Sequence, residues 1–189
     1  LIARLDADDY SLPNRLMRQV EFMDSHPKIV LCGSRFEELY GDSLASQRVQ
    51  FARTDTEIKR IASHYNPFAH SATMFRRDAY FKVGGYDKNF IIGMDYQLWI
   101  RLMEIGEVHN IDEVLTVVRV HDESISIKQN RLKTIEGIKI RYWAYSKFGG
   151  NPLLAGFFFL KSLIALALPH GLKTFFMLKT NTNDRHHNS

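Results

Sequence analysis

The chain opens with Leu-Ile-Ala-Arg-Leu-Asp-Ala-Asp-Asp (residues 1–9), a short apolar run that ends in three carboxylates. Such a run indicates a short buried strand, here Leu1–Leu5. Pro13 then suits the first turn of a helix, and apolar side chains follow at helical spacing. These are Leu12, Leu16, Val20 and Met23. The stretch therefore predicts a strand, a turn and a helix, which together are typical of an α/β fold.

Strand and helix signals continue to alternate beyond Pro27, which ends the first helix. The predicted strands are Ile29–Cys32, which Gly33 stops, then Ala72–Phe75 and Val114–Val120. The polar residues 41–56 predict a loop, and Thr56–His64 a short helix. A longer helix begins at Met94 and ends at Gly106, with Met94, Leu98, Leu102 and Ile105 on one face. This alternation favours the α/β class.

Composition places few limits on function. The 189 residues are 45% hydrophobic and 24% charged, which is ordinary for a folded soluble domain. The single cysteine, Cys32, excludes an internal disulfide and a cysteine metal cluster and fits a reducing compartment. A strand-like run begins at Leu1, with neither an initiator Met nor a signal peptide. We therefore expect an N-terminally truncated fragment.

Charge divides the chain near residue 127. Residues 1–127 carry a net charge of −4 and residues 128–189 a net charge of +8, in the part that also holds the most apolar stretch. A basic and apolar segment favours an anionic membrane surface over nucleic acid as a partner. Basic residues interleaved with aromatics on a strand or recognition helix are not evident, so no nucleic-acid partner is expected.

The C-terminal region predicts two helices. Residues 135–145 show a basic amphipathic pattern carried by Ile135, Ile138, Tyr142 and Tyr145. Pro152–Leu168 would be about 25 Å long as a helix, somewhat short for a hydrocarbon core of roughly 30 Å, and Lys161 lies near its middle. We expect peripheral attachment to the cytoplasmic face of a membrane through residues 128–180; the alternative is a buried helix. Residues 181–189 predict a disordered tail.

Asp6 and Asp8 are candidate metal ligands. They would point the same way if extended geometry persists beyond the strand, and two adjacent carboxylates suit a hard cation such as Mg²⁺ or Mn²⁺. The alternative is a solvated turn or a helix cap ahead of Pro13. The Asp-x-Asp motif alone is weak evidence for the metal site over the turn or cap.

Asp95 opens a predicted helix, where it is either an N-cap or a general base. Gly84 and Gly85 precede it and suit either a loop that folds over a substrate or an ordinary turn. His121 follows a predicted strand and could ligate a metal or be a surface histidine. His70 carries the same ambiguity.

Six ordered motifs in residues 1 to about 127 resemble glycosyltransferase family 2, of the GT-A fold. The motifs are Leu5-Asp-Ala-Asp-Asp9, Pro13-Asn-Arg-Leu16, His70-Ser-Ala-Thr-Met-Phe75, Val83-Gly-Gly-Tyr-Asp87, Met94-Asp-Tyr-Gln-Leu-Trp-Ile-Arg101 and Arg119-Val-His121. The resemblance implies a Rossmann-like α/β fold of the nucleotide-diphospho-sugar transferase type, here truncated at its N-terminus. Residues 1–127 would be the C-terminal part of that domain, followed by an α-helical extension.

The resemblance also implies a set of roles. Asp6 and Asp8 would hold Mg²⁺ or Mn²⁺ and the donor diphosphate, and His121 would reach the metal or the diphosphate. Asp95 would be the catalytic base, and Gly84 and Gly85 the glycine loop. Met94 departs from the family pattern, which usually has an acidic residue there.

The reaction implied is inverting transfer of a sugar from a nucleotide-sugar donor to a hydroxyl of a saccharide or lipid-linked acceptor. We expect it to serve cell-surface polysaccharide or glycoconjugate synthesis. Glycoside hydrolysis is disfavoured, because no second carboxylate suits the acid role. The alternatives are a metal-dependent nucleotidyl or phosphoryl transferase, which lacks its phosphate-binding Gly-Lys loop here, and a truncated, non-catalytic membrane-associated binding module.

Overall fold

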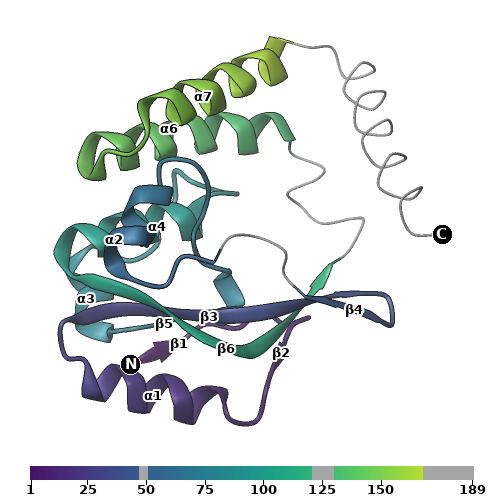
Figure 1. Ribbon diagram of the computed structural model, residues 1–189, viewed down its shortest axis with the longest axis vertical. Coiled ribbons are helices and arrows are strands. Elements are labelled where there is room, and N and C mark those ends of the chain that lie inside the picture. Colours follow the sequence, from purple (N-terminus) through teal and green to yellow (C-terminus); the bar gives the residue numbers. More distant parts are fainter. Residues whose placement is uncertain (47–50, 121–129, 168–189) are drawn as a thin grey trace.

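The computed structural model describes residues 1–46, 51–120 and 130–167, in which a six-stranded sheet has helices on both faces (Figure 1). The elements are β1 (Ile2–Ala3), β2 (Tyr10–Ser11), α1 (Arg15–Ser25), β3 (Ile29–Tyr40), β4 (Ser43–Ser46), α2 (Asp55–Ile61), the 3₁₀ turn η1 (His70–Ala72), β5 (Met74–Phe75), α3 (Arg77–Lys82), α4 (Met94–Ile105), β6 (Glu107–Val120), α6 (Asn130–Phe148) and α7 (Pro152–Ala167). The predicted α/β class is confirmed.

The two long strands form the centre of the sheet. The strand order is β1-β5-β3-β6-β2, and β4 forms a hairpin with the far end of β3. β3 and β6 run parallel, whereas the other neighbours pair antiparallel. The short strands β1 and β2 lie at opposite edges of this order, so the acidic turn at residues 6–9 connects the two edges.

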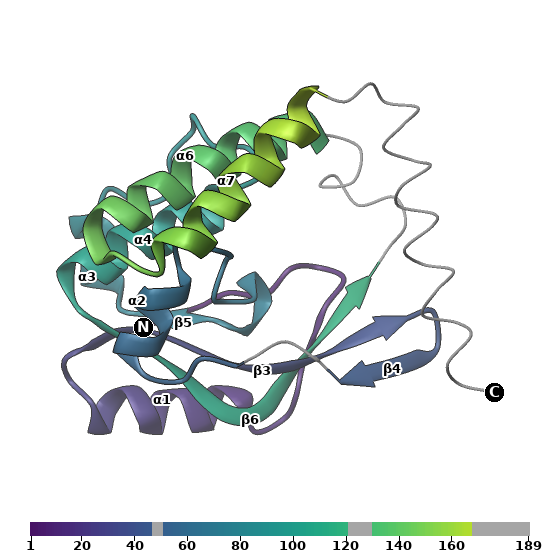
Figure 2. The same ribbon diagram turned by 45° about the horizontal axis from the view of Figure 1, so that its top comes forward.

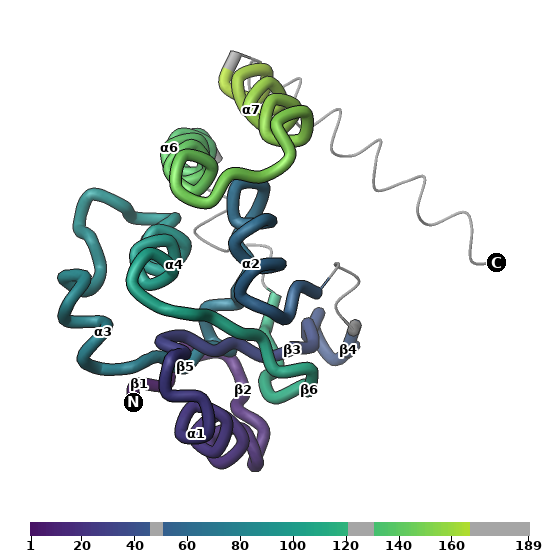
Figure 3. Tube along the Cα trace, turned by 60° about the vertical axis from the view of Figure 1, so that its left-hand side comes forward, coloured from purple at the N-terminus to yellow at the C-terminus, as the bar shows by residue number. Residues whose placement is uncertain are grey.

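The helices form layers on the two faces of the sheet. α1 covers one face alone, while α2 and α4 cover the other (Figures 1 and 3). α6 packs on α4, and α7 packs on α6 as the outermost layer (Figure 2). Residues far apart in the sequence therefore meet on the α4 side of the sheet.

Each face of the sheet has its own buried cluster. Leu31 points toward the α4 side, where it packs with Phe75 and the fully buried Trp99. Cys32, the next residue, points toward α1 and packs with Met23. This alternation follows from strand geometry, in which successive side chains face opposite sides.

All four strand predictions were wrong in extent. The strand predicted at Ala72–Phe75 is reduced to β5 because η1 precedes it, and β6 begins at Glu107 rather than Val114. β3 continues through Gly33 to Tyr40 and pairs there with β6. Glycine at position 33 leaves room for Asn110 of β6, because a Cβ there would lie 2.1 Å from Oδ1 of Asn110. The predicted loop at 41–56 contains β4 and the first residues of α2. The predicted strand at 1–5 is reduced to β1, with Leu1 and Leu5 exposed.

The buried face of α1 was also predicted wrongly. The helix buries Arg15, Gln19 and Met23, whereas Leu16 and Val20 are exposed. The Arg15 guanidinium donates to the main-chain oxygens of Arg4 (2.6 Å) and Thr73 (3.1 Å). Buried polar groups are tolerated where they find such partners, so α1 is attached to the sheet partly by hydrogen bonds.

α6 and α7 differ in how deeply they are buried. α6 buries Glu136, Ile140 and Ala144, while Tyr142, one of the residues of the predicted apolar pattern, is exposed. α7 leaves most of its apolar side chains in solvent, as described below. No helix among the described residues is both long and apolar enough to cross a bilayer. Leu168 and the predicted tail at 181–189 lie outside the described residues.

Candidate active site

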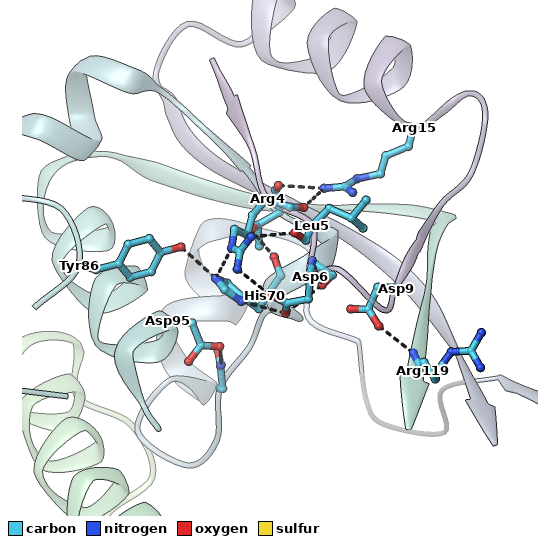
Figure 4. A network of polar contacts seen from close by, with 12 residues as sticks. Arg4, Leu5, Asp6, Asp9, Arg15, His70, Tyr86, Asp95 and Arg119 are labelled. Carbon is cyan, nitrogen blue, oxygen red and sulfur yellow. Dashed lines mark hydrogen bonds and ion pairs between the residues drawn. The ribbon is translucent and has the colours of Figure 1, made fainter. Parts of the chain in front are cut away.

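Asp6 lies at the centre of a polar network beside β1 (Figure 4). Its Oδ1 accepts from the Arg4 guanidinium at 2.6 Å, and its Oδ2 lies 3.1 Å from Nδ1 of His70 and accepts from the Ser71 hydroxyl at 3.1 Å. The N–H of Asp9 donates to the main-chain oxygen of Asp6. The chain therefore turns after Asp6, and the extended geometry required by the alternation argument does not persist.

His70 connects this network to the glycine loop. Nε2 of His70 lies 2.9 Å from the Tyr86 hydroxyl and accepts from Nε of Arg4 at 3.1 Å. Because Nε2 accepts, the ring proton belongs on Nδ1, which donates it to Asp6. The ring is thereby fixed in one orientation and one tautomer.

Asp95 lies in the first turn of α4, beside His70 (Figure 4). The N-cap residue of α4 is Gly93, so Asp95 is not the cap. The Asn66 amide donates to Oδ2 of Asp95 at 2.9 Å. Burial raises the pKa of Asp95, while the nearby His70 and the Asn66 hydrogen bond oppose that shift. A carboxylate with a raised pKa suits a general base that works near neutrality.

The glycine loop follows α3. Gly84 and Gly85 have φ angles of 82° and 68°, in the left-handed region that favours glycine. The Arg101 guanidinium on α4 donates to the main-chain oxygens of Val83 and, at 2.6 Å, of Gly85. This fixed turn directs Tyr86 toward His70.

The end of β6 lies beside the acidic turn. The N–H of Arg119 donates to Oδ1 of Asp9 at 2.8 Å, and its guanidinium stacks over the Tyr10 ring. His121 lies two residues beyond Arg119, outside the described residues. Its role as a ligand stays a prediction.

The acidic turn carries the two carboxylates, Asp6 and Asp8, that the sequence predicts as metal ligands. Among the described residues, no three His, Cys, Asp or Glu side chains lie close enough together to hold a metal ion. Asp6 already accepts three hydrogen bonds, which leaves about one of the roughly four acceptor positions of a carboxylate. Asp8 is exposed at the turn. Carboxylate oxygens suit Mg²⁺ or Mn²⁺, and the assignment of Asp6 and Asp8 as ligands stays a prediction.

The structure brings Asp6, Asp95 and the residue after Gly85 to one place, with His70 between them. Sequence reasoning did not find Arg4, Asn66 or Tyr86. Arg4 precedes Asp6 by two positions, the spacing at which side chains share one side of an extended chain, and this was the available signal. Asn66 comes from a loop with no such signal.

Comparisons with known proteins point to one family. The family described as "Glycosyl transferase family 2" matches residues 1–84. The amylovoran biosynthesis glycosyltransferase AmsE of Erwinia amylovora is 34% identical over 128 residues, 67% of this chain and 47% of that protein. The O-antigen biosynthesis glycosyltransferase WbnJ of Escherichia coli is 33% identical over 128 residues, 66% of this chain and 49% of that protein.

A further relative and a solved structure agree. The UDP-Gal:alpha-D-GlcNAc-diphosphoundecaprenol beta-1,3-galactosyltransferase of Escherichia coli is 26% identical over 146 residues, 77% of this chain and 53% of that protein. The crystal structure of S. aureus TarS 1-349 superposes with a TM-score of 0.54 and 11% identity, over 86% of this chain and 46% of that one, which shows a shared fold. The chain spans about half the length of these curated relatives.

Proposed function

Because this chain belongs to glycosyltransferase family 2, as part of a domain of the GT-A fold, we propose that its protein transfers a sugar from a nucleotide-sugar donor to an acceptor hydroxyl with inversion. The acceptor oxygen forms a bond to the anomeric carbon as the bond from that carbon to the diphosphate breaks. The nucleoside diphosphate leaves with the electron pair. The acceptor proton passes to the Asp95 carboxylate.

The observation that carries the proposal is the position of Asp95 beside the Asp6 network. His70 lies between the two carboxylates and contacts Asp6 through Nδ1. A donor diphosphate at the acidic turn and an acceptor at Asp95 would therefore be adjacent. Burial raises the pKa of Asp95, which makes it a stronger base than an ordinary aspartate.

We assign the metal to the acidic turn. Asp8, with Asp6 and His121, would hold Mg²⁺ or Mn²⁺, which when bound neutralises charge on the departing diphosphate. Arg4 and His70 keep the Asp6 carboxylate in place. Gly84 and Gly85 shape the loop that presents Tyr86 to the donor side of the site.

The names of the relatives suggest the biological setting. AmsE and WbnJ are described as glycosyltransferases of amylovoran and O-antigen biosynthesis, and a third relative as using a UDP-sugar and a diphosphoundecaprenol-linked acceptor. We therefore assign this protein to cell-surface polysaccharide synthesis, with a saccharide or lipid-linked acceptor.

A test of this function starts with the whole protein, a panel of nucleotide sugars and Mn²⁺. We expect nucleoside diphosphate release that depends on one donor and one acceptor. Asp95→Asn should lower turnover by about 10²–10⁴-fold with little change in donor affinity. Pyrophosphate release in place of nucleoside diphosphate would indicate a nucleotidyl transferase, and full activity of Asp95→Asn would contradict the base assignment.

The metal assignment has a separate readout. Calorimetry of Mn²⁺ binding in the presence of the nucleoside diphosphate should show binding to the native protein and its loss in Asp8→Ala. Asp24→Ala, an exposed carboxylate on α1, is the control. Unchanged Mn²⁺ affinity in Asp8→Ala would refute the assignment.

The outer face of α7 supports peripheral membrane attachment of the same protein. Its exposed apolar side chains are Leu153, Leu154, Phe157, Phe159, Leu160, Leu163 and Ile164. Contiguous apolar surface of this kind marks interaction sites. The net charge of +8 over residues 128–189 matches an anionic lipid surface. We place the protein on the cytoplasmic face, where nucleotide sugars are available.

A further inference from the structure

One buried carboxylate on α6 holds the start of α4. Glu136 is only 3% exposed, and it accepts three consecutive main-chain N–H groups. Oε1 accepts from Ile91 at 2.9 Å, and Oε2 accepts from Ile92 at 2.9 Å and from Gly93 at 2.7 Å. Glu136 therefore satisfies the N–H groups of the N-cap residue of α4 and of the two residues before it, although it belongs to another helix.

α4 has no cap of its own at this end. Its N-cap residue, Gly93, has no side chain to accept a hydrogen bond from the first turn. A carboxylate in that place is stabilised by the charged hydrogen bonds and by the positive end of the helix dipole. A Cβ at Gly93 would lie 2.7 Å from Cδ1 of Ile140, so glycine is what lets α6 approach closely enough.

The contact acts on the candidate base because of its place in the chain. Asp95 lies two residues after Gly93, in the first turn of α4, directly after the segment that Glu136 holds. The same loop begins at Tyr86, whose hydroxyl contacts His70. The segment from Tyr86 to Asp95 is thus held at one end by the active site and at the other by α6.

We propose that Glu136 is a positioning residue for Asp95, so that α6 forms part of the catalytic apparatus. The inference rests on the proposed function of Asp95 as the base. Glu136 does not touch the reacting atoms; it sets the position and direction of the first turn of α4. A catalytic group displaced by about 1 Å can lower turnover by roughly 10²-fold.

The test compares two glutamates that connect α4 with α6. Glu136 of α6 contacts the residues before α4, and Glu104 lies near the C-terminal end of α4. Glu136→Gln removes the charge and one acceptor oxygen, whereas Glu104→Gln removes the exposed contact with Lys147 of α6. Hydrogen–deuterium exchange of the whole protein should show about tenfold or faster exchange of peptides covering residues 86–97 in Glu136→Gln only. Peptides from β3 and β6 should be unchanged in both variants.

Kinetics then distinguish an effect of Glu136 on the position of Asp95 from an effect on the stability of the protein. Measured per folded molecule, kcat of Glu136→Gln should fall by about 10- to 100-fold with the donor KM within about twofold of the native value. Glu104→Gln should keep the native kcat. Glu136→Asp is the second variant should the amide not fold; it keeps the charge and shortens the reach, and its kcat should be reduced in the same way.

A double-mutant cycle closes the test. If Glu136 acts through Asp95, the variant carrying both Glu136→Gln and Asp95→Asn should be no slower than Asp95→Asn alone. Multiplicative losses, or an unchanged kcat in Glu136→Gln with Asp95→Asn strongly impaired, would overturn the inference and leave the proposed function standing. Full activity of Asp95→Asn would overturn both.

Discussion

At the scale of single residues, the proton affinity of Asp95 reflects opposed influences. Burial raises its pKa, while hydrogen bonds from the Tyr96 main chain and the Asn66 amide lower it. The base must be deprotonated to work, so turnover is lost as the pH falls through this pKa. Because the pKa is raised, the loss should begin at a higher pH than for an ordinary aspartate.

Asn66→Ala tests this balance. Removing the hydrogen bond at 2.9 Å removes an influence that lowers the pKa of Asp95, so the acidic limb of the kcat profile should move to higher pH. The measurement is kcat against pH for the whole protein. Asn89→Ala is the control, because that amide contacts Asp87 instead. An acidic limb that stays in place, or moves to lower pH, would contradict the account.

The same residues show how far sequence reasoning reaches. Asp6 and Asp95 were predicted as site residues because they lie in motifs that resemble the family in order, and their roles stay predictions. Their meeting at His70 was not predictable, since it depends on η1, β1 and α4 folding together. Arg4 and Tyr86 have no chemistry of their own that distinguishes them from surface residues until their partners are known.

At the scale of elements, α1 is attached to the sheet by polar groups as much as by packing. Arg15 and Gln19 reach main-chain oxygens of Arg4, Ala72 and Thr73. Helical periodicity therefore predicted the helix but not its buried face. One side of α1 carries the apolar residues Leu16 and Val20, and the side that is buried carries Arg15 and Gln19. The buried side is the one that faces the main-chain oxygens beside β1 and β5.

Arg15→Met should lower the free energy of unfolding by about 1–3 kcal/mol, because it leaves buried carbonyl oxygens without donors. Arg18→Met, on the same helix, removes an exposed ion pair with Glu113 and should change the free energy of unfolding much less, because solvent screens such a pair. Urea unfolding of both variants measures the difference. Equal effects of the two substitutions would show that α1 is held by packing alone.

At the scale of the whole molecule, the outer layer of α7 should bind lipid. The native protein should co-sediment with anionic liposomes and be released by salt, because attachment combines apolar contact with charge. Serine at Phe157 and Leu160 should reduce pelleting. Serine at Leu16 and Met17, exposed apolar residues on the opposite face, is the control. Equal pelleting of both variants, or no dependence on anionic lipid, would contradict membrane attachment through α7.

The GT-A fold was predictable at this scale because six motifs occur in a fixed order, and the structure and its likeness to TarS bear that prediction out. The residues at which the long strands end could not be predicted. β3 passes through Gly33 because it pairs there with β6, far along the chain, where Asn110 lies against the glycine. Contacts of this kind carry no local signal, so a glycine that locally indicates a strand end proves to lie within the strand.

The parallel pairing of β3 with β6 also determines the order in which the chain can fold. Leu31 pairs with Val108, so the centre of the sheet joins segments separated by most of the described domain. Such distant pairing is slow, because the intervening chain must lose its freedom before the contact forms. A nascent chain that ended before β6 would present β3 with an unpaired edge. During synthesis the edge of β3 that β6 covers therefore stays unpaired until β6 has been made.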